Sequence, residues 1–128
     1  MRQKILIVED DRDCRELIVI QLRALHYTTI EAESGAKGFQ RAISETPDLI
    51  IMDLGLLGVS GIEAMLWLKE DPRTKHIPII VYIAWREEGS KKKLLQLGAA
   101  KVLAKPVSTV ELHEVVQGLL EVSLQTWL

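Results

Sequence analysis

Five short apolar runs alternate with amphipathic stretches, and this rhythm constrains the fold more than any other feature of the chain. The apolar runs are as long as β-strands, and most are rich in branched aliphatic residues. They comprise residues 4–8, 27–32, 48–53, 78–84 and 101–104. Helical periodicity predicts helices at about 12–26, 35–45, 61–70, 87–97 and 109–126. Strands that alternate with helices predict a parallel sheet with helical crossovers.

Two of the predicted strands show that the sheet is covered on both sides. Residues 4–8 and 48–53 are apolar on both faces instead of alternating with polar residues, which is typical of strands buried between helical layers. The sequence therefore predicts an α/β fold, a (βα)5 three-layer sandwich with a doubly wound five-stranded parallel sheet. We expect residues 1–128 to form a single domain, because no Gly-, Ser- or Pro-rich linker divides them.

Several residues predict where the helices begin and end. Ser60 with Glu63, and Ser108 with Glu111, fit a capping box in which a hydroxyl and a carboxylate satisfy free amides of the first turn. Gly98 is a plausible C-terminal stop for the fourth helix.

Composition excludes several classes of protein. Apolar residues make up 48% and charged residues 27% of the 128, and no apolar run approaches the roughly 18 residues of a membrane span. The N-terminus lacks a secretory signal, so we expect a cytoplasmic protein without a membrane partner. A net charge of -2 argues against direct nucleic acid binding. The lone Cys14 shares a helical face with Leu17 and Ile18, and we interpret it as a core residue.

Charged residues follow three of the predicted strands. Glu9, Asp10 and Asp11 follow the first strand, Asp53 ends the third, and Lys105 follows the fifth. In open α/β sheets ligands bind outside the carboxyl ends of the strands, where these side chains should meet. Neighbouring carboxylates repel one another unless a cation joins them, and oxygen ligands with open positions suit Mg²⁺ and a phosphoryl group. An aspartate is a known phosphoryl-accepting nucleophile, and a lysine pairs with phosphoryl oxygens as a point charge.

Together these motifs resemble the response-regulator receiver domain of two-component signalling. The acidic pair, "DLGLLGVSG" after the third predicted strand and "AKP" after the fifth carry the resemblance, which covers essentially the whole chain. It implies a flavodoxin-like sheet in the order 2-1-3-4-5 and a cis peptide before Pro106.

The resemblance also implies roles for individual residues. Asp53 would accept a phosphoryl group from a histidine kinase or phosphotransfer protein, with Lys105 on the phosphoryl oxygens. Asp10 would bind Mg²⁺ directly and Glu9 through water, with Asp53 and the backbone carbonyl of Gly55 as further ligands. Asp11 is interpreted as the N-cap or a first-turn acid of the first helix. Such a domain is not a conventional enzyme, since it catalyses at most its own phosphoryl transfer and dephosphorylation.

Three positions depart from the family pattern. Ile83 stands where receivers carry a phosphoryl-binding Ser or Thr, Val102 replaces the switch aromatic of the fifth strand, and Leu57 replaces a proline. The neighbouring Tyr82 should point to the opposite face and cannot supply the missing hydroxyl. Trp85 has two interpretations, a lid over the acidic pocket or plain packing.

These departures leave two hypotheses open. The first is a Mg²⁺-dependent receiver that accepts a phosphoryl group on Asp53 and signals through protein–protein interaction. The alternative is a pseudo-receiver that binds its partners without phosphorylation, motivated by Ile83 and Val102. In either case a downstream protein or a second copy would meet the face of the fourth helix, fifth strand and fifth helix, which carries Lys91 to Lys93 and Lys101.

Overall fold

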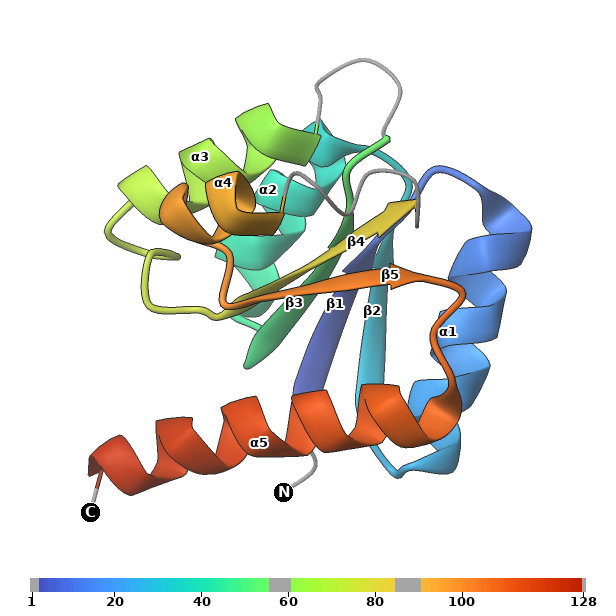
Figure 1. Ribbon diagram of the computed structural model, residues 1–128. Helices are drawn as coiled ribbons and strands as arrows, with labels where there is room; N and C mark the ends of the chain where they lie inside the picture. The colour runs from blue at the N-terminus through green and yellow to red at the C-terminus, as the bar shows by residue number, and fades with distance from the viewer. Residues whose placement is uncertain (1–2, 56–60, 85–90, 128) are drawn as a thin grey trace.

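The computed structural model describes residues 3–55, 61–84 and 91–127 of the chain (Figure 1). Strands and helices alternate through these residues as the sequence predicts. In chain order they are β1 (Lys4–Val8), α1 (Arg12–Ala24), β2 (Thr28–Ala32), α2 (Gly35–Glu45), β3 (Leu49–Asp53), α3 (Gly61–Glu70), β4 (Ile79–Ala84), α4 (Lys91–Gln96), β5 (Lys101–Lys105) and α5 (Thr109–Trp127). All neighbouring strands pair in parallel, and the sheet order β2-β1-β3-β4-β5 confirms the prediction.

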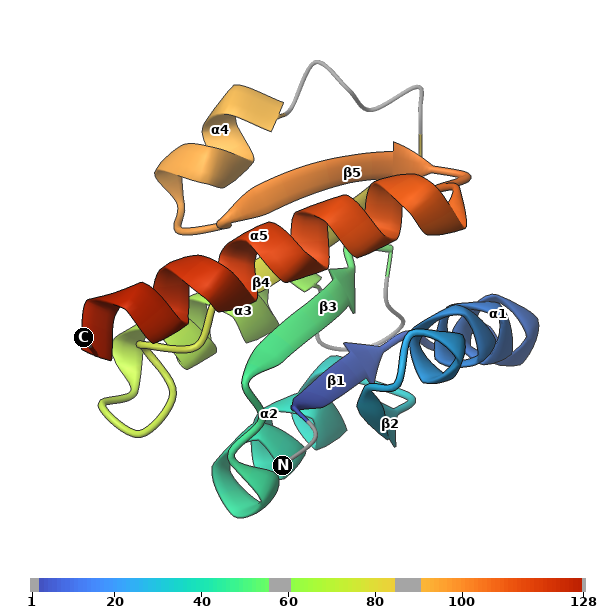
Figure 2. The same cartoon turned by 90° about the horizontal axis from the view of Figure 1, so that it is seen from below.

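Helices cover both faces of the sheet, which confirms the three-layer sandwich (Figures 1 and 2). Successive side chains of a strand point to opposite faces, so alternate residues enter two separate apolar clusters. On one face Leu6 and Val8 of β1 join residues of α2, α3 and α4. On the other face Ile5 and Ile7 join residues of α1 and α5. Strands with two buried faces therefore lack polar alternation.

Local signals at the helix ends agree with the structure where they can be followed. Gly98 has a φ of +120° just after α4 and ends it in a conformation that favours glycine. The Ser108 hydroxyl accepts a hydrogen bond from the Glu111 amide at 3.1 Å, as an N-cap does. Ser60, the other predicted cap, lies outside the described residues, as do positions 87–90 of the predicted fourth helix.

The prediction that Cys14 belongs to the core is wrong. Cys14 is exposed, and Leu17 on the same helical face is 58% exposed. The core stripe of α1 is instead made by Ile18, Val19 and Leu22. Cys14 lies in the first turn of α1, where its amide donates to the Asp11 side chain beyond the carboxyl end of β1.

None of the helices in the described residues combines the length and the apolar character that a membrane crossing requires.

Candidate functional site

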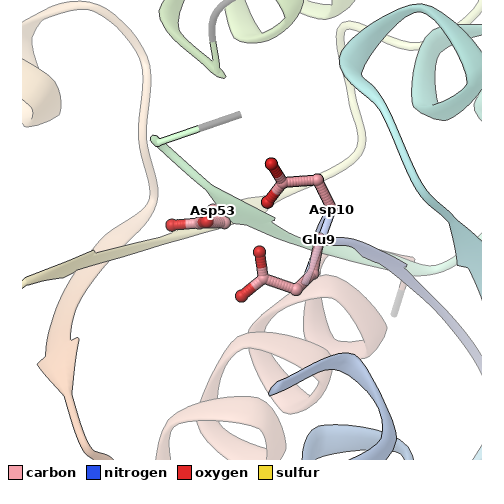
Figure 3. A group of neighbouring side chains, drawn as sticks. All are labelled: Glu9, Asp10 and Asp53. Atoms are coloured by element: carbon pink, nitrogen blue, oxygen red, sulfur yellow. The ribbon is translucent and has the colours of Figure 1, made fainter. Parts of the chain in front are cut away.

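Three carboxylates meet at the carboxyl ends of β1 and β3 (Figure 3). Glu9 and Asp10 directly follow β1, and Asp53 is the last residue of β3, which pairs with β1. One carboxylate oxygen from each residue lies within 4.8 Å of the others. Glu9 is only 1% exposed and Asp53 9%, so two of these acids are held away from bulk water. The fold thus brings together the acids that the sequence predicts.

Lys105 completes the group from the end of β5. Its Nζ lies 3.0 Å from Asp53 Oδ1 and 3.2 Å from Glu9 Oε1, so one ammonium group pairs with both carboxylates. The peptide bond between Lys105 and Pro106 is cis, which confirms that expectation. A charge-assisted contact of this kind is stronger in a partly buried site than on the surface.

Burial dominates the protonation behaviour of this group. Burial raises the pKa of Glu9 to about 8, and the neighbouring Asp53 carboxylate acts in the same direction, while Lys105 opposes both. For Lys105, burial lowers the pKa, but hydrogen bonds and charges from Asp53 and Glu9 outweigh burial and raise it overall. Glu9 therefore keeps its proton at neutral pH in the metal-free site, which limits the negative charge that Lys105 has to balance.

The donor set fits a hard divalent cation such as Mg²⁺. Glu9 Oε2 is buried without a hydrogen-bond partner in the part of the chain that the structure describes, and a buried polar atom of this kind calls for a ligand. The surrounding donors are carboxylate oxygens, which Mg²⁺ prefers. The Gly55 amide donates to Asp53 Oδ1 at 3.4 Å, which places Gly55 beside Asp53. The role of its carbonyl as a ligand stays a prediction.

The turn between β1 and α1 is held by two residues beside the acids. Asp11 is the N-cap of α1 and accepts from the Cys14 amide at 3.0 Å, as expected, and this backbone hydrogen bond lowers the pKa of Asp11. Arg15, which the sequence reading missed, donates to the backbone carbonyl of Glu9 at 2.8 Å and pairs with Glu31 of β2 at 3.1 Å. Arg15 thus ties α1 to the edge that presents Glu9.

The two atypical positions, Ile83 and Val102, lie on the same face of the sheet. Ile83 is 1% exposed and Val102 is 7% exposed, and both belong to the apolar cluster that includes Leu94 of α4. Tyr82 belongs to the opposite cluster, which confirms that its side chain points away from Ile83. Leu57 and Trp85 lie outside the described residues.

Tyr82 is a site residue whose contact the sequence reading missed. Lys105 Nζ lies 5.5 Å from the centroid of the Tyr82 ring, within the range of a cation–π contact. The β4–β5 register pairs Ala84 with Lys105, two residues beyond Tyr82 along the same edge. Strand periodicity gave the face on which Tyr82 lies, but this register was needed to bring the ring close to the lysine.

The predicted partner surface combines exposed lysines with a groove. Lys92, Lys93 and Lys101 are exposed on α4 and β5. A groove of about 370 Å³ runs between β5 and α5 and is lined by Lys101, Glu114, Val115, Gly118 and Leu119.

Comparisons with known proteins agree with this geometry. The family model of the response regulator receiver domain matches residues 5–117. The polar-differentiation response regulator DivK of Brucella ovis is 34% identical over 120 residues, which are 94% of this chain and 98% of the relative.

Two solved structures show how far the similarity extends in space. A response regulator from Chloroflexus aurantiacus superposes with a TM-score of 0.90 at 30% identity, over 94% of this chain and 99% of that one. The receiver domain of a sensor histidine kinase from Pseudomonas aeruginosa, which has a magnesium ion coordinated in its active-site cleft, gives a TM-score of 0.87 at 29% identity, with coverage of 94% and 99%.

Proposed function

The chain belongs to the family of response regulator receiver domains, and from that premise we propose that it accepts a phosphoryl group on Asp53 in a Mg²⁺-dependent reaction. Receiver domains are signalling modules and not conventional enzymes, and they bind Mg²⁺ at an acidic pocket such as the cluster of Glu9, Asp10 and Asp53. The donor in this proposal is a histidine kinase or phosphotransfer protein of the cytoplasm.

The contact between Lys105 and Asp53 is the observation that carries the proposal. At 3.0 Å the ammonium group already lies beside the oxygen atoms that would receive the phosphoryl group. In the transfer, an Asp53 carboxylate oxygen bonds to phosphorus, the phosphorus–nitrogen bond of the donor breaks, and its electron pair leaves on the imidazole nitrogen. Lys105 then stabilises the phosphoryl oxygens as a point charge.

Glu9, Asp10, Asp53 and the Gly55 carbonyl are the residues that would hold Mg²⁺. When bound, the ion supplies charge neutralisation for the phosphoryl oxygens. The Glu9 and Asp53 carboxylates repel each other when both are ionised, and this repulsion contributes to the raised pKa of Glu9. It gives a physical reason for the site to bind a cation.

Incubation with acetyl phosphate and Mg²⁺ tests the proposal directly. Wild type should acquire an acid-labile phosphate, detectable as a mass increase, and Asp53→Asn should acquire none. Asp13→Asn is the matched control, because Asp13 is exposed in the first turn of α1 and should leave labelling unchanged. Absence of label on wild type, or equal label on Asp53→Asn, would refute the role of Asp53.

The packing of Ile83 favours a second candidate function, a pseudo-receiver that binds partners regardless of phosphorylation. Ile83 of β4 and Val102 of β5 place buried aliphatic side chains in the cluster that includes Leu94 of α4, and they offer no hydroxyl to a phosphoryl group. Loss of one charge-assisted hydrogen bond removes about 1.5–3 kcal/mol, comparable to a typical allosteric coupling energy. A partner affinity that is identical for unlabelled wild type and Asp53→Asn, with no labelling of wild type, would select this candidate.

Signal output in either case is proposed to use the face of α4, β5 and α5. Lys101 lines the groove beside the apolar Val115 and Leu119. Lys92 and Lys93 add exposed positive charge on α4. This combination suits a protein surface with acidic residues around an apolar anchor, on a downstream partner or a second copy.

A further inference from the structure

The Tyr82 ring lies against the ammonium group of Lys105 and is rigidly supported. Tyr82 is 7% exposed and belongs to the cluster that includes Ile18 of α1 and Val107 just after β5. Lys105 is less confined, since its side chain is 29% exposed. A fixed aromatic face therefore meets the end of a flexible four-carbon stem at 5.5 Å.

Lys105 also has room to move away from the acids. A cavity of about 120 Å³ borders both Lys105 and Tyr82, and its other walls include Cys14, Leu17 and Pro106. A lysine that is free to enter such a space loses side-chain entropy when it is held at one place. Attraction to the face of a fixed ring compensates part of that loss and favours the position beside Asp53.

The ring contact differs from the two ion pairs in one respect. Asp53 and Glu9 attract Lys105 by charge, and the Asp53 carboxylate is itself changed when a phosphoryl group arrives. The quadrupole of the Tyr82 ring is the same before and after such a change. A contact of constant strength keeps the lysine at the edge of the site while its carboxylate partners change.

We propose that Tyr82 is a positioning residue, whose aromatic face holds the Lys105 ammonium group at the place where it meets the phosphoryl oxygens. The role in phosphoryl transfer rests on the proposed function of Asp53, whereas the ring–ammonium contact itself does not. The ring, and not the phenol hydroxyl, carries the effect, because it is the ring face over which the Lys105 ammonium group lies.

The contact is tested first without any phosphodonor. Tyr82 is replaced by phenylalanine and by mono-, di- and trifluorophenylalanine, which keep the ring shape but weaken its negative face step by step. The urea midpoint of the metal-free protein should decrease along this series in the Lys105 background and show no such trend in Lys105→Met. Equal decreases of the urea midpoint with Lys105 and with Lys105→Met would show that the ring does not attract the ammonium group. The same series at Tyr27, a half-buried residue just before β2, is the matched control.

The positioning role is tested by the rate of labelling with saturating acetyl phosphate and Mg²⁺. Tyr82→Phe should stay close to wild type, and the trifluorinated ring should lower the maximal rate about two- to fivefold, the equivalent of a cation–π contact at a partly exposed site. Normal labelling of wild type with a flat fluorination series would overturn the positioning role. An unlabelled wild type would instead refute the proposed function and, with it, the positioning role, while the midpoint series still decides whether the contact exists.

Discussion

Two adjacent residues at the carboxyl end of β4 point to opposite faces of the sheet, and the two faces differ in chemistry. Tyr82 faces α1 and α5 and lies against Lys105, which pairs with Glu9 and Asp53. Ile83 faces the opposite helical layer and belongs to the apolar cluster that includes Leu94 of α4. The first face contributes to the charged site, and the second holds Ile83, which in the proposed function stands at the switch position. The proposed function therefore keeps the chemistry of the first face and differs from the family pattern in the coupling through the second.

Different interactions stabilise the two faces. The charged group depends on the balance of a lysine against buried carboxylates, which changes with protonation and with bound cations. The cluster around Ile83 depends on apolar burial and close packing, which do not change with pH in the same range. Conditions that alter one face should leave the other nearly unchanged.

The largest expected effect that separates the faces is the pH dependence of stability in the metal-free protein. The pKa of Glu9 is about 8 in the fold against a usual value of 4.5. Between these values the folded chain holds a proton that the unfolded chain has lost, so the free energy of unfolding should decrease as pH rises from about 4.5 to about 8. Urea unfolding in EDTA across this range measures the slope.

Glu9→Gln should flatten that slope, because glutamine does not titrate. Glu16→Gln, a change of an exposed glutamate on α1, should leave it intact. An unchanged slope in Glu9→Gln would mean that another group dominates the pH dependence.

Ile83→Ala measures the strength of the apolar face. Removing this buried side chain should lower the free energy of unfolding by about 2–5 kcal/mol at every pH, through lost burial and a residual cavity. Ile20→Ala is the matched control, since Ile20 of α1 is 64% exposed and should contribute far less. Similar losses for the two variants would contradict the packing assigned to Ile83.

Lys105→Met tests the charged face through its chemistry. Loss of the ammonium group should lower the rate of labelling by acetyl phosphate about 10- to 100-fold, the equivalent of a charge-assisted hydrogen bond. Lys101→Met is the control at the opposite, exposed end of β5 and should label at the wild-type rate. Equal rates for the two variants would exclude a role for Lys105 in the transfer.

The sequence predicts the fold and the meeting of the acids because both depend on strong, short-range patterns. Strands that are apolar on both faces require two helical layers, and parallel strands place Glu9, Asp53 and Lys105 at the same edge. The identity of that edge follows from strand direction alone, so no side-chain detail was needed.

Other features depend on geometry that a linear pattern does not contain. Cys14 fits the periodicity of a buried stripe, but the stripe of α1 is set by how the helix lies on the sheet, and its first turn projects into solvent. The contacts of Arg15 with the Glu9 carbonyl and of Tyr82 with Lys105 need the rotamers of long side chains and the register between strands. These contacts support the site without belonging to its recognised motif.

The smallest expected effect concerns the coupling itself. In Ile83→Thr with Val102→Tyr, a hydroxyl and a large aromatic replace the aliphatic side chains that pack near Leu94. Phosphorylation should then change the hydrogen-exchange protection of α4 amides by about 1 kcal/mol, at the lower end of allosteric coupling energies. In wild type the change should be smaller, because Ile83 offers the phosphoryl group no hydrogen bond and Val102 has no large rotamer change to make.

The Ile83→Thr single variant separates the two contributions. It restores a hydroxyl that can bond to the phosphoryl group, but it keeps Val102 in place of an aromatic. Equal protection changes in wild type and the double variant would show that coupling to α4 does not pass through this face of β4, and the difference between the two faces would then concern packing alone.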